Sequence, residues 1–323
     1  MAGLKELRTR LESAHSTQQL TSAMKMVSVS KLRKAQVRAA NVRGICLRLL
    51  EVYRSIVSDK EDAEENVLLH KGYAKEEKVL LIVIASDKGM CGSFNTNICK
   101  GAEAYIKEHY THVAQKDIRI LAVGNRAVSY FSSRPYPLFK DRPGLPIEGL
   151  DYAKAAGVMK EVVAEFKAGG LHRVDIVYCK PINAATQIVR SRTILPVDGV
   201  LELGDSLLKI ESRTKTSVAI IDNVHRARKY ASNFDSQTEV LPDLPAVIGM
   251  MLPLIPVLYF YFTLCQSAVA EHGARMTAMS KASDNAEALI KELNLKYNKM
   301  RQSAITNELL EIVSGANALN DNE

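Results

Sequence analysis

One short stretch of the 323-residue chain combines residue types that could do chemistry. It is the glycine-containing loop Ser86–Asn95, which follows an apolar run and holds Asp87, Gly89, Cys91 and Gly92. Such a loop between a strand and a helix could cradle a phosphate at the helix N-terminus. Its G-x-x-G spacing, however, matches neither G-x-G-x-x-G nor G-x-x-x-x-G-K-[ST]. A tight turn whose glycines adopt positive φ explains the same residues, so we interpret it as a structural loop.

Other candidates for catalysis or metal binding are weak. Cys91 could act as a nucleophile, but no histidine lies near it in the sequence to activate it. The seven histidines lack metal-ligand spacing, although His109 and His112 come close together at a predicted helix end. The five scattered cysteines are typical of free thiols in a reducing compartment. The sequence therefore predicts no catalytic, cofactor-binding or metal-binding residue.

The elements around this loop predict an α/β domain over residues 78–243. Lys78–Ala85 is a continuous apolar run rich in β-branched residues, which is typical of a strand buried on both faces. Residues 195–243 show no clear pattern, and Ser217–Ile221 is one further candidate strand within them. The alternation favours a small, mostly parallel, Rossmann-like sheet with covering helices. The other predicted strands are Ile118–Val123, Val174–Cys179 and Thr186–Ser191, and the predicted helices are Thr96–His109, Asn125–Ser132 and Asp151–Lys167, with Asp151 as an N-cap.

The C-terminal residues 257–323 predict one helix much longer than a domain is wide. Apolar residues recur at alternating steps of four and three from Leu258 to Ala304, and the pattern then slips by one residue and continues from Ile305. This heptad spacing winds a helix around a partner in a left-handed supercoil. His272, a polar residue on the seam, is expected to fix the register.

Residues 1–57 predict the partner helix. Apolar residues recur at steps of three and four before Ala14 and again after Leu32. The 18 residues between these two positions equal two heptads plus four, which we interpret as a stutter over His15–Ser30. Both helices leave the same α/β domain, so we predict that they form a long antiparallel two-helix coiled coil. The acidic stretch 58–77 is expected to be a solvated linker.

Charge is concentrated in the N-terminal helix. Residues 1–57 carry eleven Lys or Arg and three acids, a net charge of +8, while the rest of the chain carries −1. A helix this basic is expected to bind an acidic partner, which can be a protein, a nucleic acid or a membrane surface.

A stretch of 27 residues without charge, 244–270, is long enough to span a bilayer. Four helix-breaking residues interrupt its first half: Pro245, Gly249, Pro253 and Pro256. Its second half already lies in the heptad pattern. The alternative to a membrane span is an apolar connector, 244–256, followed by buried first turns of the long helix. The sequence leaves both interpretations open.

Three sequence blocks closely resemble the γ subunit family of F-type ATP synthases. They occur in the family's order and at its spacing, and they cover both ends of the chain and the start of the middle domain. The blocks are TSAMKMVSVSKLRKAQ (Thr21–Gln36), SDKGMCGSFNTNI (Ser86–Ile98) and AEHGARMTAMSKASDNAEALIKELNLKYNKMRQSAITNELLEIVSGANAL (Ala270–Leu319).

The resemblance implies a non-catalytic rotor subunit. In this family the terminal helices turn inside a ring of three α and three β subunits, and the α/β domain meets ε and the membrane-embedded c-ring of Fo outside it. Proton flow turns the rotor, and the β subunits make ATP; δ is a further expected partner. The chain would bind no nucleotide, cofactor or nucleic acid and contact the membrane only through Fo. Without a visible targeting signal, we expect a peripheral location on the cytoplasmic face of a bacterial inner membrane.

The resemblance also implies which residues contact partners. Arg275 matches a family contact position, and Glu271 one helical turn earlier is expected to pair with it. We expect torque to be exchanged at the stutter and at the slip, where the heptads are irregular. The contacts for the acidic catch region of β are Met24, Lys25, Arg301, Gln302 and Thr306, with the basic residues Lys31, Arg33 and Lys34 as further partner contacts.

Overall fold

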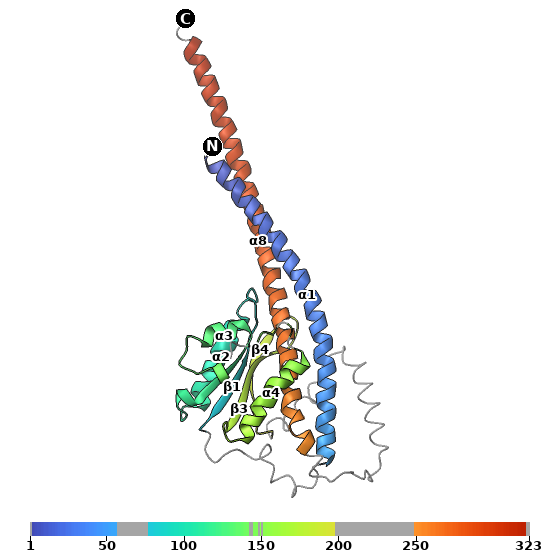
Figure 1. Cartoon of the computed structure of the whole chain (residues 1–323). Helices are drawn as coiled ribbons and strands as arrows, with labels where there is room; N and C mark the ends of the chain where they lie inside the picture. Colours follow the sequence, from blue (N-terminus) through green and yellow to red (C-terminus); the bar gives the residue numbers. More distant parts are fainter. Residues whose placement is uncertain are drawn as a thin grey trace, which may run out of the picture.

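The computed structural model describes residues 2–56, 77–141, 145–147, 149, 151–197 and 249–320. Figure 1 shows a small α/β domain beside two long helices that run side by side. The candidate strand Ser217–Ile221 and nearly all of the predicted linker 58–77 lie outside the described residues.

The domain is built on a four-stranded sheet with the strand order β2-β1-β3-β4. β1 (Val79–Ile84) lies between β2 (Ile118–Val123) and β3 (Arg173–Pro181) and is parallel to both, whereas β4 (Gln187–Leu195) is antiparallel to β3. Every residue of β1 is fully buried, as expected for a central parallel strand. The predicted mixed α/β architecture with a mostly parallel sheet is therefore confirmed.

Helices cover both faces of the sheet because alternate residues of each strand point to opposite sides. α2 (Phe94–His109) and α3 (Asn125–Phe131) pack on one face, and α4 (Tyr152–Lys167) packs on the other together with the long helices. The carboxylate of Asp151 accepts a 2.9 Å hydrogen bond from the Lys154 amide, which confirms the predicted N-cap. Two short 3-10 helices, η1 and η2, complete the domain at Gln115–Asp117 and Phe139–Asp141.

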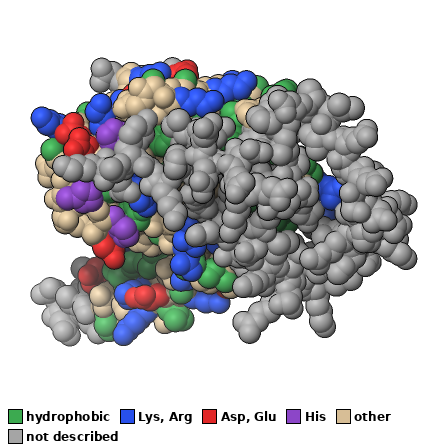
Figure 2. All heavy atoms as spheres, turned by 90° about the horizontal axis from the view of Figure 1, so that it is seen from below, with side chains coloured by type: hydrophobic (Ala, Val, Ile, Leu, Met, Phe, Trp, Pro, Cys, Tyr) green, Lys and Arg blue, Asp and Glu red, His purple; other side chains and the backbone are tan. Residues whose placement is uncertain are grey.

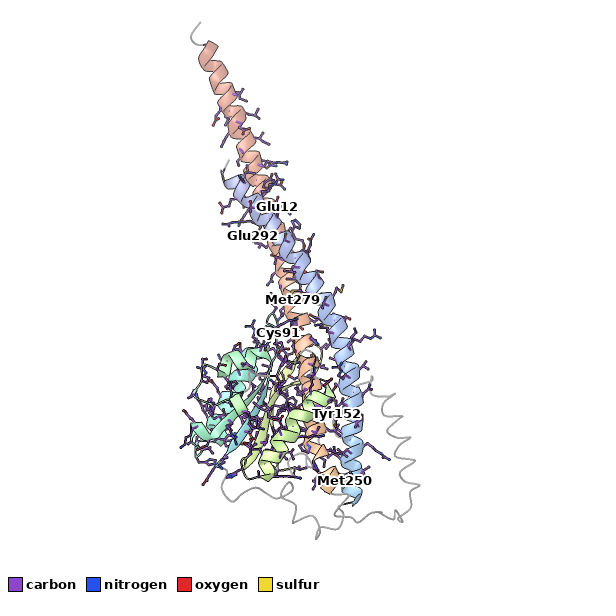
Figure 3. All side chains as sticks on the ribbon, viewed as in Figure 1. Glu12, Cys91, Tyr152, Met250, Met279 and Glu292 are labelled. Carbon is purple, nitrogen blue, oxygen red and sulfur yellow. The ribbon has the colours of Figure 1, made fainter. Side chains whose placement is uncertain are left out.

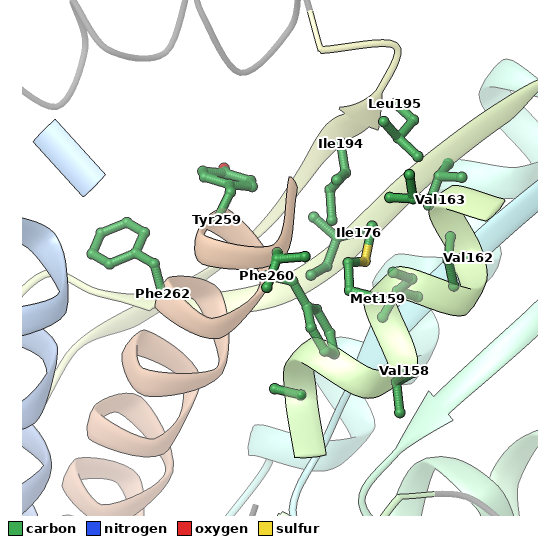
Figure 4. Close-up of a cluster of buried hydrophobic side chains, with 14 of the residues drawn as sticks. Val158, Met159, Val162, Val163, Ile176, Ile194, Leu195, Tyr259, Phe260 and Phe262 are labelled. Atoms are coloured by element: carbon green, nitrogen blue, oxygen red, sulfur yellow. The ribbon is translucent and has the colours of Figure 1, made fainter. Parts of the chain in front are cut away.

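The uncharged stretch ahead of the long C-terminal helix is part of the protein core. α8 (Leu254–Asn320) begins against the sheet, and residues 249–251 are already helical. In Figure 4, Met159 of α4, Ile176 of β3 and Phe260 of α8 point into one cluster. By length and composition α8 could cross a membrane, but 67% of its most apolar 18-residue window is buried inside the protein. Packing on the domain accounts for the apolar character of this helix.

α1 (Ala2–Ile56) and α8 run antiparallel and form the shaft visible in Figure 1. Lys25 Nζ donates a 3.0 Å hydrogen bond to Ser280 Oγ, and the Cys46 thiol lies 3.6 Å from the Leu258 carbonyl oxygen. A residue of α1 and a residue of α8 therefore lie side by side when their residue numbers sum to roughly 305. Because helices rise about 1.5 Å per residue, α8 projects roughly 25 Å beyond the start of α1.

The predicted stutter in the N-terminal helix is wrong. The seam continues at steps of three and four through Gln18, Thr21, Lys25 and Ser28, which are polar. Thr21 is 8% and Ser28 2% exposed, and each hydroxyl donates to the helix carbonyl one turn earlier. The register is thus unbroken, and the stutter resulted from counting only apolar residues.

The predicted register slip lies outside the two-stranded part of the shaft. Ile305, Leu309 and Ile312 are 49%, 57% and 68% exposed, beyond the level at which α1 begins. A change of apolar face here follows from the loss of the partner helix. It cannot disturb the coiled coil itself.

Candidate partner-binding site

Arg275 of α8 ties the shaft to the loop that the sequence singled out. Its guanidinium forms a 2.8 Å ion pair with Glu271, which confirms the predicted pair. The same group donates to the backbone carbonyl oxygens of Lys88 and Gly89 at 3.3 and 3.4 Å. One side chain therefore joins two turns of the shaft to the loop after β1.

The ion pair is largely removed from water. Glu271 is only 8% exposed. Burial raises the pKa of the Glu271 carboxyl group above its ordinary value, although the neighbouring Arg275 opposes this shift. The guanidinium is therefore what allows a charged carboxylate at this buried position.

The loop itself is closed by hydrogen bonds among its own side chains. The Ser86 amide donates to Asn95 Oδ1 at 2.9 Å, and Asn95 Nδ2 donates to the Cys91 thiol at 3.2 Å. Cys91 is 2% exposed, whereas Met90 has a φ of 62° and is 62% exposed. Figure 3 places Cys91 where the domain meets the shaft. These contacts support a structural role for the loop, with the Cys91 thiol enclosed rather than presented to a substrate.

A steric contact at Gly273 is a second interlock between the domain and the shaft, the first being the contacts of Arg275. A Cβ added at Gly273 of α8 would lie 2.6 Å from the Ala184 carbonyl oxygen, in the turn between β3 and β4. Asn183 closes that turn, because its Oδ1 accepts hydrogen bonds from two following amides. Only glycine permits this close approach of backbone to helix.

A cavity of about 320 Å³ opens beside Arg275, between α1, α8 and the loops of the domain. It brings together five of the residues predicted from the sequence: Lys31, Lys34, Asp87, Glu271 and Arg275. Sequence reasoning missed three further polar side chains in its wall, which are Arg38, Lys88 and His272. His272 was expected to fix the register of the coiled coil. Its Nδ1 instead lies 3.4 Å from the Arg275 guanidinium, on the cavity side of the shaft.

The remaining predicted contacts do not form one surface. Met24 and Lys25 lie level with Ser280, whereas Arg301 and Gln302 lie about 21 residues, or roughly 32 Å, farther along the shaft. Thr306 is exposed near the tip, as Arg301 and Gln302 are. Arg33 is exposed on α1, outside the cavity wall. The structure therefore separates the predicted contacts into a cavity group, a mid-shaft group and a tip group.

Both helices of the shaft expose large apolar side chains. On α1 these include Leu20, Met26 and Val27, at 59%, 68% and 57% exposure, and on α8 the tip residues are similarly exposed. The opposite end of the molecule differs: Figure 2 shows acidic, basic and histidine side chains interspersed over its described surface. Extended apolar exposure of this kind indicates a surface that another protein covers.

Comparison with known proteins identifies the family. A family model described as ATP synthase matches residues 3–319. The ATP synthase gamma chain of Cytophaga hutchinsonii is 36% identical over 325 residues, covering 99% of this chain and 100% of that protein. The chain belongs to the ATP synthase gamma family. The gamma chain of Bdellovibrio bacteriovorus is 38% identical over 322 residues, covering 99% of each. The family resemblance seen in the three sequence blocks is thus confirmed.

Chains of solved ATP synthase structures share the fold. A chain of the central stalk and c-ring of the Tetrahymena thermophila mitochondrial ATP synthase matches with a TM-score of 0.53 and 25% identity, covering 82% of this chain and 99% of that one. A chain of the Euglena gracilis mitochondrial ATP synthase matches with a TM-score of 0.58 and 19% identity, covering 98% and 95%.

Proposed function

We propose that the chain is the central-stalk γ subunit of a bacterial, proton-translocating ATP synthase. The shaft of α1 and α8 turns inside a ring of α and β subunits, and the α/β domain meets ε and the c-ring of Fo, with δ as a further subunit of the complex. Rotation of the c-ring is transmitted through the shaft to the catalytic β subunits. The chain itself carries out no chemistry and reaches the membrane only through Fo, on its cytoplasmic face.

The exposed apolar tip of α8 is the observation that carries this proposal. Beyond the start of α1 the helix continues alone, yet Leu309 and Leu310 are 57% and 59% exposed and Val313 is 54% exposed. Apolar residues on several sides of an unaccompanied helix are best explained by an enclosing sleeve. Family membership identifies that sleeve as the ring of α and β subunits.

The two interlocks at Arg275 and Gly273 support transmission of torque. One is electrostatic and one is steric, and they join α8 to separate loops of the α/β domain. Closely packed interfaces are stiff and transmit strain. A rotation applied to the domain by the c-ring is therefore expected to turn the shaft with it.

We assign two groups of predicted contacts to the acidic catch region of the β subunits. The contacts for this acidic catch region are Met24 and Lys25 at mid-shaft, and Arg301, Gln302 and Thr306 near the tip. The residues in or beside the cavity are further partner contacts of the assembled complex: Lys31, Arg33, Lys34, Glu271 and Arg275. We divide the chain into a first coiled-coil helix (1–57), the α/β domain (78–243), the connector (244–256) and a second coiled-coil helix (257–323). The last three residues of the connector already belong to α8.

The sequence also allowed a nucleic-acid-binding arm and a membrane anchor, and both are less well supported. Membership of the gamma family accounts for the basic helix without nucleic acid. A nucleic-acid-binding arm would bind DNA or RNA with an affinity that falls steeply as salt rises. A membrane anchor would resist extraction by low salt or mild chelation without detergent.

Reconstitution tests the proposal. The purified chain is mixed with α and β subunits, and the complex is isolated and assayed for ATP hydrolysis. We expect co-purification of all three, ATPase activity in the complex and none in the chain alone. ATP hydrolysis by the pure chain, or its failure to join α and β, would contradict the proposed role.

A further inference from the structure

The cavity beside Arg275 has a surplus of positive charge. Its volume of about 320 Å³ lies within the usual range of small-molecule sites. Among the described residues, five cationic side chains and two carboxylates line it, a net charge of +3 without counting His272. The cations come from three separate elements: Lys31, Lys34 and Arg38 from α1, Lys88 from the loop and Arg275 from α8.

The two carboxylates in the wall already have partners within the protein. Asp87 Oδ1 accepts a 3.1 Å hydrogen bond from the Asn125 amide, and Glu271 is paired with Arg275. Within the part of the chain that the structure describes, no acidic oxygen lies within 4.0 Å of Lys34 or Arg38. The charges of these two residues are therefore presented to the cavity without a matching anion from the described residues.

The three cations of α1 form a row along one face of the helix. Lys31, Lys34 and Arg38 follow steps of three and four, a spacing at which like charges are neighbours and repel each other. The row is about 10 Å long at 1.5 Å per residue. A single phosphate can touch only part of this row, whereas several linked phosphoryl groups can follow it. Arginine and lysine are the residues that bind phosphoryl oxygens, the former often with two hydrogen bonds.

Apolar side chains also line the cavity, Ile147, Tyr261 and Leu264 among them. An apolar wall lowers the local dielectric and strengthens the attraction of the cations for an anion. The enclosed volume suits a small molecule better than a helical peptide, whose diameter alone is about 10 Å.

We propose that this cavity binds a linear polyphosphoryl group, as found in inorganic polyphosphate or a nucleoside triphosphate. Lys34 and Arg38 hold the chain of phosphoryl groups along α1, and Lys88 reaches it from the loop. A ligand held in this way links α1 to the α/β domain across the junction that Arg275 already joins to α8. The proposal concerns the isolated chain, before Lys34 meets any partner subunit, so its test does not depend on the rotor function.

Calorimetric titration of the purified full chain tests the proposal, with sodium tripolyphosphate as the probe at low ionic strength. We expect one molecule bound per chain, at least about tenfold more tightly than orthophosphate. The double variant Lys34→Gln/Arg38→Gln should weaken binding at least about tenfold, because two charge-assisted contacts are lost. The matched variant Lys100→Gln/Lys281→Gln removes the same charge outside the cavity wall and should change affinity less than about twofold. Circular dichroism confirms that each variant is folded.

Two further titrations identify the source of the phosphoryl groups and the competing ligand class. ATP binding as tight as or tighter than tripolyphosphate supports a nucleoside triphosphate, and markedly weaker ATP binding supports inorganic polyphosphate. Equal losses in the two double variants would overturn the proposal, because binding would then follow net charge alone. Absence of binding, equal affinity for orthophosphate, or tighter binding of hexaglutamate would also overturn it, the last by assigning the cavity to an acidic protein segment.

Discussion

Replacing Arg275 with alanine is expected to destabilise the chain in a pH-dependent way. The Arg275 and Glu271 side chains are only 11% and 10% exposed, and the variant leaves the carboxylate without its counter-charge. Removing one partner of a buried ion pair costs about 3–5 kcal/mol. The pair lies at the rim of a cavity, so we expect a loss in the free energy of unfolding of about 3 kcal/mol near pH 7.5.

The pH dependence follows from the pKa of Glu271. Burial raises this pKa even with Arg275 present, and loss of the guanidinium raises it further. A carboxyl group with a raised pKa in the folded state stabilises fully below its unfolded pKa of about 4.3, and this contribution is lost as pH rises through the folded pKa. The penalty of Arg275→Ala is therefore largest at neutral pH and shrinks as the pH falls toward about 4.5, where the carboxyl is protonated.

Urea unfolding followed by circular dichroism at neutral and mildly acidic pH measures this effect. The control is the double variant Glu271→Gln/Arg275→Ala, which removes both charges. It should be more stable than Arg275→Ala at neutral pH and show no pH-dependent penalty. An equal loss for Arg275→Ala at both pH values, or a double variant less stable than the single one at neutral pH, would refute the reasoning.

Three further predictions concern the shaft. Gly273→Ala should lower the free energy of unfolding by about 1–3 kcal/mol, because its Cβ would lie 2.6 Å from the Ala184 oxygen. Gly44→Ala, where no described atom lies within 4 Å of the added Cβ, should raise it by up to about 1 kcal/mol, and urea unfolding would reveal a reversal of this order. Thr21→Val should raise the urea midpoint by an amount corresponding to about 1 kcal/mol, because it replaces a polar seam residue with an apolar one; a lower midpoint would contradict the unbroken seam. Deleting residues 310–323 should leave the thermal transition of the α/β domain unchanged, since the tip packs on none of the described part of the domain, and calorimetry that showed the transition lost would count against this architecture.

The strands and the domain helices could be predicted because their patterns are local. The apolar run before Ser86 predicted β1 to within one residue at each end, and Asp151 marked the start of α4. The strand predicted at Thr186–Ser191 ended four residues before β4 does, because Arg192 and Thr193 interrupt the apolar pattern where the strand continues beside β3. Local pattern is sufficient where burial decides the residue type.

Features that depend on the pairing of distant segments could not be predicted in the same way. The polar residues Thr21 and Ser28 continue the seam, but only the heptad spacing, and not their type, could have revealed this. Lys34 and Arg38 share a cavity with Arg275 because of the antiparallel register of the two helices. That register is set by packing along the whole shaft, so the sequence predicted the pair of Glu271 and Arg275 within one helix but not the cavity around it.

Direct observation of rotation tests the central claim, that the chain is a shaft turning within a ring. A complex with α and β subunits is fixed to a surface through the ring, and a probe is attached to the α/β domain. During ATP hydrolysis, the account predicts that the probe turns in one direction, in steps equal in number per turn to the β subunits. Sustained ATP hydrolysis by the assembled complex without rotation of the probe would contradict it.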